Sequence, residues 1–166
     1  QQITPTPTDE IHLQETITQL KNQIKPYLAT YDIPITPHLV GSTAKHTYLK
    51  NQLDIDLFLI FPQNTPKTLL ANITRTIGTS LLTDTEECYA EHPYIRGTFK
   101  KYKTEIVPCY DIQHATEKQS AVDRTPLHTI YIQKHLKAYQ YPHVRLLKQF
   151  LHGIGCYGAE AEIEGF

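Results

Sequence analysis

Apolar residues recur at two different spacings along this chain, and each spacing predicts a different kind of element. Between residues 8 and 28 they return every three or four positions, which is typical of a helix with one buried face, with Thr8 or Asp9 as its cap. Residues 53–61 instead form a nearly continuous apolar and aromatic run around two aspartates, typical of a buried central strand. The first part of the chain therefore predicts a helix packed against a sheet.

Prolines and glycines separate the remaining elements. Pro66 opens a helical pattern that ends near Gly78, and Pro126 and Pro142 open two more. After the first helix, the expected elements are a short strand through Leu39 and Val40, a turn and short helix at Gly41-Ser42, the strand 53–61, the helix 66–78 with Leu69, Leu70, Ile73 and Ile77 on its buried side, the strands 89–99 and 103–109 joined as an antiparallel hairpin near Lys100-Lys101, a loop over 121–126, and helices over 126–139 and 142–151. This order predicts an α+β fold.

Composition narrows the class of protein. The chain has 166 residues, a formal net charge of -1 and 20% charged residues, which fits one domain with a sizeable core and no large basic surface. Three widely spaced cysteines form no CxxC pair, and no apolar run reaches membrane-spanning length, so we expect a soluble cytoplasmic protein without a membrane partner. Two local basic groups remain, at Arg96, Lys100, Lys101 and Lys103 and at Lys134, Lys137, Arg145 and Lys148.

The most informative chemistry is a pair of carboxylates in the buried strand. Asp54 and Asp56 alternate with apolar neighbours, so both can face a cleft while Ile55 and Leu57 face the core. Glu105 is placed in a later strand that we expect to adjoin the first. Three carboxylates so arranged suit two Mg²⁺ ions about 4 Å apart, which is the arrangement used for nucleotidyl transfer, with Glu105 also drawing the proton from the acceptor hydroxyl.

Phosphate-binding groups flank these carboxylates in the sequence. Ser42 lies at a turn into a helix, where a hydroxyl and backbone N–H groups form a natural phosphate cradle. Lys45 and Lys148 are candidate partners for a triphosphate. Each motif alone is common: a D-x-D is often a solvated edge, and Glu105 could be a surface carboxylate. Their combination in this order is far more specific. The nine histidines form no H-x-x-x-H or HExxH pair, so no zinc site is expected.

Four segments of the chain resemble the amino-terminal part of the archaeal (class I) CCA-adding enzyme family of the polymerase-β superfamily. They are VGSTAKHTYLKNQLDIDLFLIFP, AEHPYIRGTFKKYKTEIVPCYDI, SAVDRTPLH and VRLLKQFLHGIGCYGAEAEIEGF, and they cover most of residues 38–166 in the family's order. The resemblance implies an extended leader over residues 1–7, a nucleotidyltransferase head with a palm-like sheet over 8–140, and the beginning of a helical neck domain over 141–166, from a protein that continues further.

The resemblance also implies roles for individual residues. Asp54, Asp56 and Glu105 would hold the two Mg²⁺ ions. The triphosphate contacts would be Ser42, Lys45, Thr125, Lys148 and Tyr157, and the residues lining the site would be Gly41, His92 and His128. Two positions depart from the family: Lys45 stands where Arg is common, which loses bidentate phosphate contact, and Glu105 stands where Asp is usual. Tyr157, among Gly153, Gly155 and Gly158, could instead belong to a packed turn.

The implied activity is template-independent addition of nucleotides from CTP and ATP to the 3′ end of tRNA. Because family members are longer, we expect base selection and most of the tRNA surface to lie beyond Phe166, and this chain alone to bind Mg²⁺ and triphosphate weakly, with little tRNA affinity. Two alternatives remain open. One is a self-standing minimal nucleotidyltransferase that modifies another acceptor, and the other is a non-catalytic nucleotide-binding module. The sequence leaves the oligomeric state and the preference between CTP and ATP open.

Overall fold

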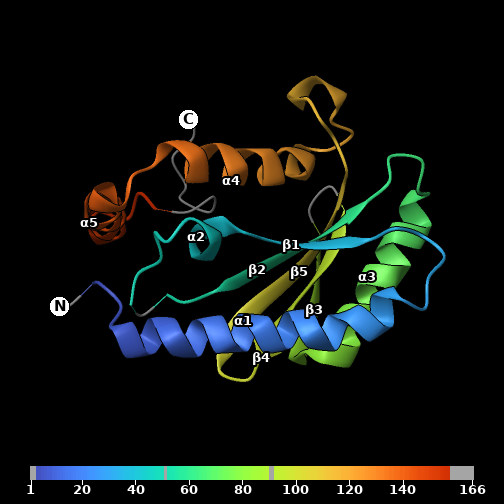
Figure 1. Cartoon of the computed structure of the whole chain (residues 1–166), viewed down its shortest axis with the longest axis horizontal. Helices are drawn as coiled ribbons and strands as arrows, with labels where there is room; N and C mark the ends of the chain where they lie inside the picture. Colours follow the sequence, from blue (N-terminus) through green and yellow to red (C-terminus); the bar gives the residue numbers. More distant parts are fainter. Residues whose placement is uncertain (1–2, 51, 90–91, 158–166) are drawn as a thin grey trace.

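A mixed sheet with helices on both faces forms the protein (Figure 1). The computed structural model describes residues 3–50, 52–89 and 92–157. The strands are β1 (Thr36–Val40), β2 (Ile55–Phe61), β3 (Thr83–Tyr89), β4 (Pro93–Phe99) and β5 (Tyr102–Tyr110). The helices are α1 (Pro7–Leu28), α2 (Gly41–Ala44), α3 (Lys67–Leu81), α4 (Arg124–His135) and α5 (Tyr141–Gly153), with single 3-10 turns η1 (Ala115–Glu117), η2 (Ala121–Asp123) and η3 (Ala138–Gln140). The predicted α+β class is confirmed.

The two central strands are far apart in sequence. The strand order is β1-β2-β5-β4-β3, and β2 pairs with β5 in parallel while the other neighbours are antiparallel. A parallel pair needs a crossover connection, and here α3, β3 and β4 lie between the two strands in the chain. Both central strands are buried on both faces over much of their length, which explains their continuous apolar character.

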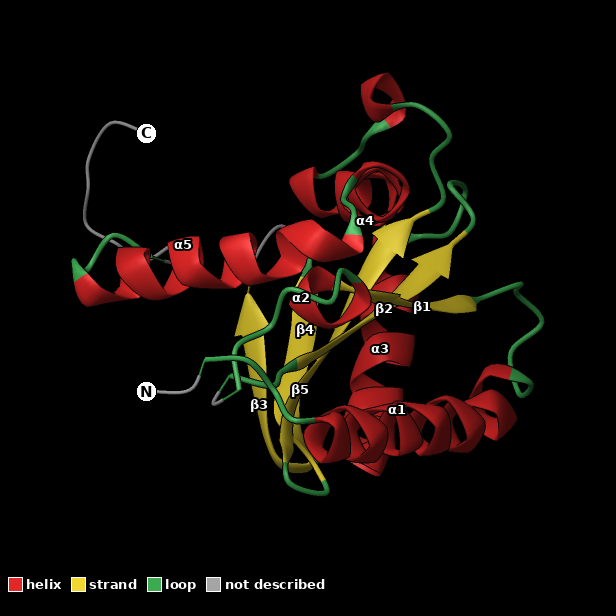
Figure 2. Cartoon of the chain, turned by 60° about the vertical axis from the view of Figure 1, so that its left-hand side comes forward, coloured by secondary structure: helices red, strands yellow, loops and turns green. Residues whose placement is uncertain are grey.

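The main core lies between the sheet and the two helices α1 and α3. Ile55 and Leu57 of β2 are fully buried in it, as the alternation predicted. Leu13, Leu20 and Ile24 from α1 are also fully buried. Figure 2 shows α1 and α3 on one side of the sheet and α2, α4 and α5 on the other. On that second side, the described residues form a smaller buried apolar cluster of Val40, Phe58, Val107 and Cys109.

Helix α3 differs from its prediction in one residue of its buried face and in the residue at which it ends. Leu69 is 38% exposed and does not belong to the buried side. The helix also passes Gly78 and ends at Leu81. A Cβ on Gly78 would lie 2.6 Å from Cβ of Ile95, so this glycine lets the helix approach β4 and is not a helix end.

The structure differs from the predicted elements in three further places. Helix α1 begins at Pro7, inside the predicted leader, because Thr6 is its cap: Asp9 N donates to Thr6 Oγ1 and Thr6 N donates to Asp9 Oδ2. Strand β3 was not predicted as a separate strand, since TDTEECY is a mostly exposed edge strand without an apolar face. The predicted loop over 121–126 contains η2 and the start of α4.

Asp123 connects the end of β5 to the start of α4. Its side chain is 1% exposed and accepts hydrogen bonds from the backbone N–H groups of Tyr110 (2.9 Å) and Ser120 (2.7 Å). A buried carboxylate with several N–H partners fixes the path of the backbone strongly. Within the VDRTPLH segment, which carries part of the family resemblance, Asp123 thus stabilises the fold.

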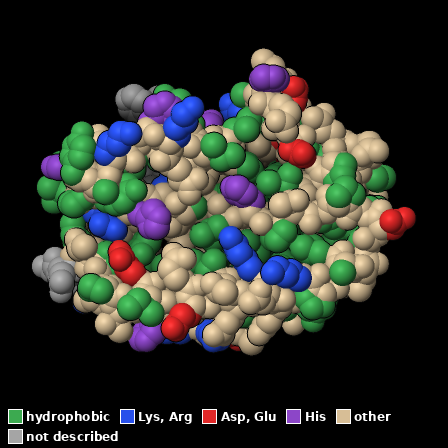
Figure 3. Space-filling model, viewed as in Figure 1, with side chains coloured by type: hydrophobic (Ala, Val, Ile, Leu, Met, Phe, Trp, Pro, Cys, Tyr) green, Lys and Arg blue, Asp and Glu red, His purple; other side chains and the backbone are tan. Residues whose placement is uncertain are grey.

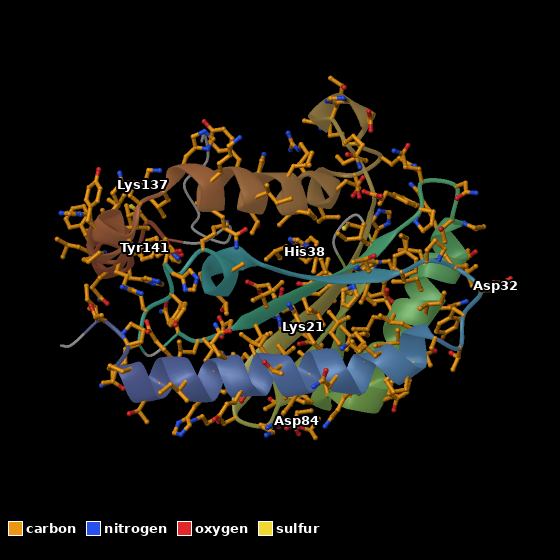
Figure 4. The ribbon with its side chains drawn as sticks, in the orientation of Figure 1. Lys21, Asp32, His38, Asp84, Lys137 and Tyr141 are labelled. Carbon is orange, nitrogen blue, oxygen red and sulfur yellow. The ribbon has the colours of Figure 1, made fainter. Side chains whose placement is uncertain are left out.

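The division of the chain into a head over residues 8–140 and a neck over 141–166 stays a prediction. The expected boundary after residue 140 coincides with the start of α5 at Tyr141, and the Tyr141 ring stacks on His46 with centroids 5.8 Å apart. Figure 4 shows Tyr141 and Lys137 at the end of the molecule where α4 gives way to α5. Residues 158–166, including the predicted Gly158, lie outside the described residues. Within the described part of the chain, no helix is both long and apolar enough to cross a membrane.

His38 on β1 gives a pH dependence that can be measured. Burial, and less strongly the charge of Lys21, lowers the pKa of His38 from its ordinary value of 6.5; Figure 4 shows Lys21 on α1 below this strand. The unfolded state therefore binds more protons, so stability is full above pH 6.5 and falls as the pH drops through 6.5 toward the folded pKa. We expect His38→Gln to flatten this fall in urea unfolding between pH 7.5 and 5. The same substitution at exposed His12 is the control, and an unchanged slope in His38→Gln would contradict the assignment.

Candidate functional site: a carboxylate cleft

Asp56 and Glu105 lie directly opposite each other on the two central strands. Asp56 of β2 is in register with Glu105 of β5 and, on its other side, with Val40 of β1. Neighbouring strands are about 4.8 Å apart, so the two carboxylates share one end of the same sheet face. The predicted neighbourhood of these two strands is confirmed. It depends on the parallel register, which the sequence did not specify.

Asp54 lies just outside the strand in which it was predicted. Strand β2 begins at Ile55 rather than at Leu53. The backbone carbonyl of Asp54 accepts a short hydrogen bond from Thr43 Oγ1 in α2. Asp54 nevertheless lines the same cleft as Asp56. Thr43, which the sequence analysis did not single out, therefore links the turn after β1 to the first carboxylate.

Gly41 makes room for Asp56. It has a φ of +68°, and a Cβ on it would lie 1.8 Å from Asp56 Oδ2. No side chain fits at that distance, and L-residues avoid that backbone conformation. Gly41 was predicted only to line the site. The structure shows that it supports the position of the Asp56 carboxylate and starts α2 at the same point.

Burial and repulsion from two other carboxylates both disfavour the charged form of Asp56. Burial first, and then the nearby charges of Glu105 and Asp54, raise the pKa of Asp56 to about 6, although Lys45 and Lys148 act in the opposite direction. Three carboxylates thus influence one another in a partly buried place. A group of acidic oxygens whose own repulsion is not offset is chemically suited to a divalent cation.

Glu105 has a partner of its own in Arg96. Arg96 of β4 is in register with Glu105, and its Nε donates to Glu105 Oε1 over 2.9 Å. The Arg96 and Glu105 side chains are 46% and 31% exposed. A pair this exposed contributes at most about 1 kcal/mol, so Glu105 can exchange Arg96 for a cation at little cost. The sequence analysis noted Arg96 only as part of a basic group.

These residues surround an open cleft of about 400 Å³. It contains all three predicted carboxylates together with two from β3, the strand that the sequence analysis missed. The lining residues are Asp54, Asp56, Asp84, Glu86, Arg96, Gly97, Thr98, Lys103 and Glu105. Among the residues of the described ranges, no three His, Cys, Asp or Glu side chains are gathered closely enough to enclose a metal ion as they stand.

Lys148 and Tyr157 approach the carboxylates from the carboxyl-terminal part of the chain. Burial, and then the charges of Lys45 and Arg145, lower the pKa of Lys148, while Asp56 raises it. Its Nζ donates to Thr47 Oγ1 over 3.4 Å. Burial and the charge of Asp54 raise the pKa of Tyr157. The two residues predicted from this part of the chain are thus brought to the acidic site.

Arg145 holds the helix that carries Lys148. It is 5% exposed, and it donates from Nε to the Tyr48 carbonyl (3.0 Å) and from a terminal nitrogen to the His46 carbonyl (2.9 Å). From the sequence, Arg145 was expected only as one of a group of basic residues. We expect Arg145→Leu to destabilise the fold by about 2 kcal/mol, because two carbonyl groups lose a charged donor. Thermal unfolding against exposed Lys134→Leu tests this, and equal midpoints in the two variants would contradict it.

The other predicted residues lie at varying distances from the cleft. Ser42 and Lys45 belong to the half-buried turn around α2, where Thr47 N donates to the Ser42 carbonyl (3.0 Å). Thr125 is half-buried and His128 exposed on α4, and neither lines the cleft. His92 is 3% exposed, packs edge-on against Tyr110, and lines a separate cavity with Lys67 and Lys118. The structure does not bring His92 into the acidic cleft.

Fold and site together define a class of protein. The chain matches the nucleotidyltransferase domain family over residues 21–128, and it belongs to that family. Within it, the chain is similar to archaeal CCA-adding enzymes. It is 43% identical to the Halobacterium salinarum enzyme over 166 residues, which are 100% of this chain and 37% of that protein. It is 36% identical to the Thermococcus gammatolerans enzyme over 169 residues, again 100% and 37%. The chain thus spans little more than a third of these relatives.

Solved structures agree on the fold. The Cid1 poly(U) polymerase with Mg and 3′-dATP bound superposes with a TM-score of 0.66 at 16% identity, over 90% of this chain and 43% of that one. The E. coli CdnC structure with ATP gives 0.65 at 20% identity, over 92% and 55%. At such identities the likeness concerns the fold alone. Together with the family match, it confirms the predicted nucleotidyltransferase fold, a mixed sheet with flanking helices.

Proposed function

We propose that this chain carries the catalytic part of a CCA-adding enzyme, which transfers nucleotides from CTP and ATP to the 3′ end of tRNA. The observation that carries the proposal is the register of Asp56 with Glu105 beside Gly41, which gathers acidic oxygens at one end of the sheet. Similarity to CCA-adding enzymes over the whole chain supports the choice of substrates. The chain spans 37% of the length of each of these two relatives.

The proposed cation ligands are Asp54, Asp56 and Glu105. Two bound Mg²⁺ ions would supply charge stabilisation at the α-phosphate and the leaving pyrophosphate. The pKa of Asp56 is raised by burial and then by the charges of Glu105 and Asp54, more than Lys45 and Lys148 lower it, and a divalent cation at this place would relieve that repulsion. Glu105 has one carboxylate oxygen on Arg96, and we propose that it also accepts the proton of the acceptor hydroxyl.

The proposed triphosphate site lies on the α2 and α5 side of the carboxylates. Ser42 offers its hydroxyl at the turn, and Lys45 and Lys148 offer charge close to Asp56. Tyr157 adjoins Asp54. The electrostatic influence of Lys45, Lys148 and Tyr157 on the carboxylates supports this assignment, and Ser42 is supported by its place directly after Gly41. Thr125, His92 and His128 have only the family resemblance, and the structure leaves them outside the cleft.

A transfer assay tests the proposal. The chain is incubated with Mg²⁺, each labelled triphosphate in turn, and a tRNA that lacks its terminal A or a short acceptor-stem RNA. We expect CMP and AMP to be added to the RNA 3′ end, weakly and with poor discrimination between bases. Labelling of a different acceptor would instead indicate a minimal nucleotidyltransferase. No labelling of any acceptor at saturating triphosphate would contradict catalysis by this chain.

A further inference from the structure

A second groove, of opposite charge, adjoins the carboxylate cleft. It has a volume of about 590 Å³ and shares Asp54 and Lys103 with the cleft. The lining residues that matter here are Lys50, Asp54, Lys101, Lys103, His152 and Tyr157. Asp54 at the shared border is the only carboxylate in this lining, whereas five carboxylates line the cleft. Carboxylates thus predominate on the cleft side of Asp54, and lysines predominate on the groove side.

Three lysines from separate parts of the chain give the groove its charge. Lys50 follows α2 and is fixed by its backbone, since Lys50 N donates to the Ile3 carbonyl over 2.9 Å. Lys101 lies at the β4–β5 turn, with its Nζ 5.3 Å from the centre of the Tyr102 ring, and Lys103 follows in β5. Lys101 and Lys103 are exposed. Among the hydrogen bonds and ion pairs of the described residues, none joins these three ammonium groups to a carboxylate. The nearest acidic influence besides Asp54 is Asp9 of α1, whose pKa is lowered by hydrogen bonds from Thr6 and then by the charges of Lys50 and Lys101.

The position of this groove matters because two phosphate-bearing substrates must meet at the carboxylates. Lys45 and Lys148, on the α2 and α5 side, act on Asp56 and suit the triphosphate. Lys103, on β5, stands two residues before Glu105 and lines both the cleft and the groove. The groove therefore leads away from Glu105, the residue proposed to act on the acceptor hydroxyl.

The aromatic side chains favour a nucleic acid over an isolated anion. The rings of His152 and Tyr157 lie against each other with centroids 4.0 Å apart, and Tyr157 is 38% exposed. Grooves that bind single-stranded nucleic acid combine cations along the backbone with rings that stack on bases. Elsewhere the surface is mixed: Figure 3 shows basic, acidic and apolar side chains interspersed on one face without a continuous basic field. With a net charge of -1, RNA affinity has to come from a local site of this kind.

We propose that the groove of Lys50, Lys101 and Lys103 binds the phosphodiester backbone of the single-stranded 3′ end of the RNA acceptor. The inference rests on the proposed function for the identity of the acceptor. It assigns a role to Lys101 and Lys103, two members of the basic group around the β4–β5 turn. The groove leads the terminal hydroxyl past Lys103 toward Glu105, and it meets the proposed triphosphate site at Tyr157, which lines the groove.

The test measures binding without catalysis. A fluorescein-labelled single-stranded RNA 12-mer ending in CC is titrated with the 166-residue chain by anisotropy at several KCl concentrations, without triphosphate. For single strands, each lost phosphate contact reduces the slope of log affinity against log salt by about 0.7. We therefore expect Lys50→Gln/Lys101→Gln to reduce the slope by about 1.4 and to weaken binding roughly 10- to 30-fold at 0.1 M KCl. Lys67→Gln/Lys118→Gln, which also removes two exposed lysines, is the control.

The second arm measures binding of CTP and ATP to the same variants in the presence of Mg²⁺. We expect the dissociation constants for triphosphate to stay within about twofold of wild type, because the removed charges lie outside the proposed triphosphate site. A wild-type salt slope in Lys50→Gln/Lys101→Gln, or loss of triphosphate binding with RNA binding intact, would overturn the proposal. Lysine-dependent RNA binding without nucleotidyl transfer would leave the groove intact and refute the proposed function instead.

Discussion

Asp56→Asn is expected to reduce nucleotidyl transfer by about 1000-fold, equivalent to about 4 kcal/mol of transition-state stabilisation. Asn keeps the shape of the side chain and removes the central charge of the three carboxylates. Asp56 is the residue on which the fields of Asp54, Glu105, Lys45 and Lys148 converge. The measurement is the rate of CMP and AMP addition at saturating Mg²⁺.

The same variant should be more stable than wild type when no divalent cation is present. The folded pKa of Asp56 is raised from 3.8 to about 6, so the folded state binds more protons than the unfolded state between these values. Stability is therefore fully retained below pH 3.8 and is lost as the pH rises through 6. The loss at pH 7.5 is up to about 3 kcal/mol, and Asp56→Asn removes it. Urea unfolding at pH 7.5 in EDTA measures the difference.

Lost activity together with gained stability distinguishes a catalytic carboxylate from a structural one. Asp32→Asn is the control, because Asp32 is exposed at the end of the molecule away from α5 (Figure 4). It should change neither quantity. Wild-type transfer by Asp56→Asn would rule out cation-dependent catalysis at this site, and a loss of stability would contradict the electrostatic account of Asp56.

Gly41→Ala is expected to lower the transfer rate by roughly 100-fold, since displacing a reacting group by about 1 Å can cost that much. The added Cβ would meet Asp56 Oδ2 at 1.8 Å, so the carboxylate has to move. The positive φ of Gly41 adds about 1 to 2 kcal/mol of backbone strain. Transfer rates and thermal unfolding of the variant measure the two effects separately.

Gly153→Ala on α5 is the matched control for this substitution. A Cβ on Gly153 meets nothing within 4 Å, and alanine favours helix. This variant should keep the wild-type rate and a stability equal to or slightly above wild type. If Gly41→Ala behaved like Gly153→Ala, the close packing of Gly41 on Asp56 would have no part in the reaction.

Buried elements of the fold were predictable because their apolar patterns reflect their surroundings. The run around Ile55 and Leu57 gave β2, and the helical spacing of Leu13, Leu20 and Ile24 gave α1. Strand β3 was missed because it is an edge strand whose residues are mostly exposed, so its pairing with β4 leaves no apolar signature. The first residue of α1 was missed because Thr6 and Thr8 are both acceptable caps, and only the return bond from Asp9 distinguishes them.

For the site, the carboxylates could be proposed from sequence but their partners could not. Alternation placed Asp56 on the face opposite the core, and the expected neighbourhood of two strands pointed to Glu105, in agreement with the family resemblance. The ion pair of Glu105 with Arg96 follows from the β4–β5 register, in which Phe99 pairs with Tyr102 across the Lys100-Lys101 turn. The hairpin and its turn were predicted, but this pair was not drawn from them. Arg145 was grouped with surface charges, although its burial on the carbonyls of His46 and Tyr48 depends on where α5 docks. Tertiary register is the information that the sequence alone lacks here.

The most direct test of the central claim is a crystal structure of the chain with Mn²⁺ and a non-hydrolysable ATP analogue, with the cations located by their anomalous signal. The account predicts Mn²⁺ between Asp54, Asp56 and Glu105, a triphosphate directed toward Ser42, Lys45 and Lys148, and Glu105 released from Arg96. Cations bound elsewhere, or a triphosphate lying away from the Gly41-Ser42 turn while Arg96 keeps Glu105, would contradict it.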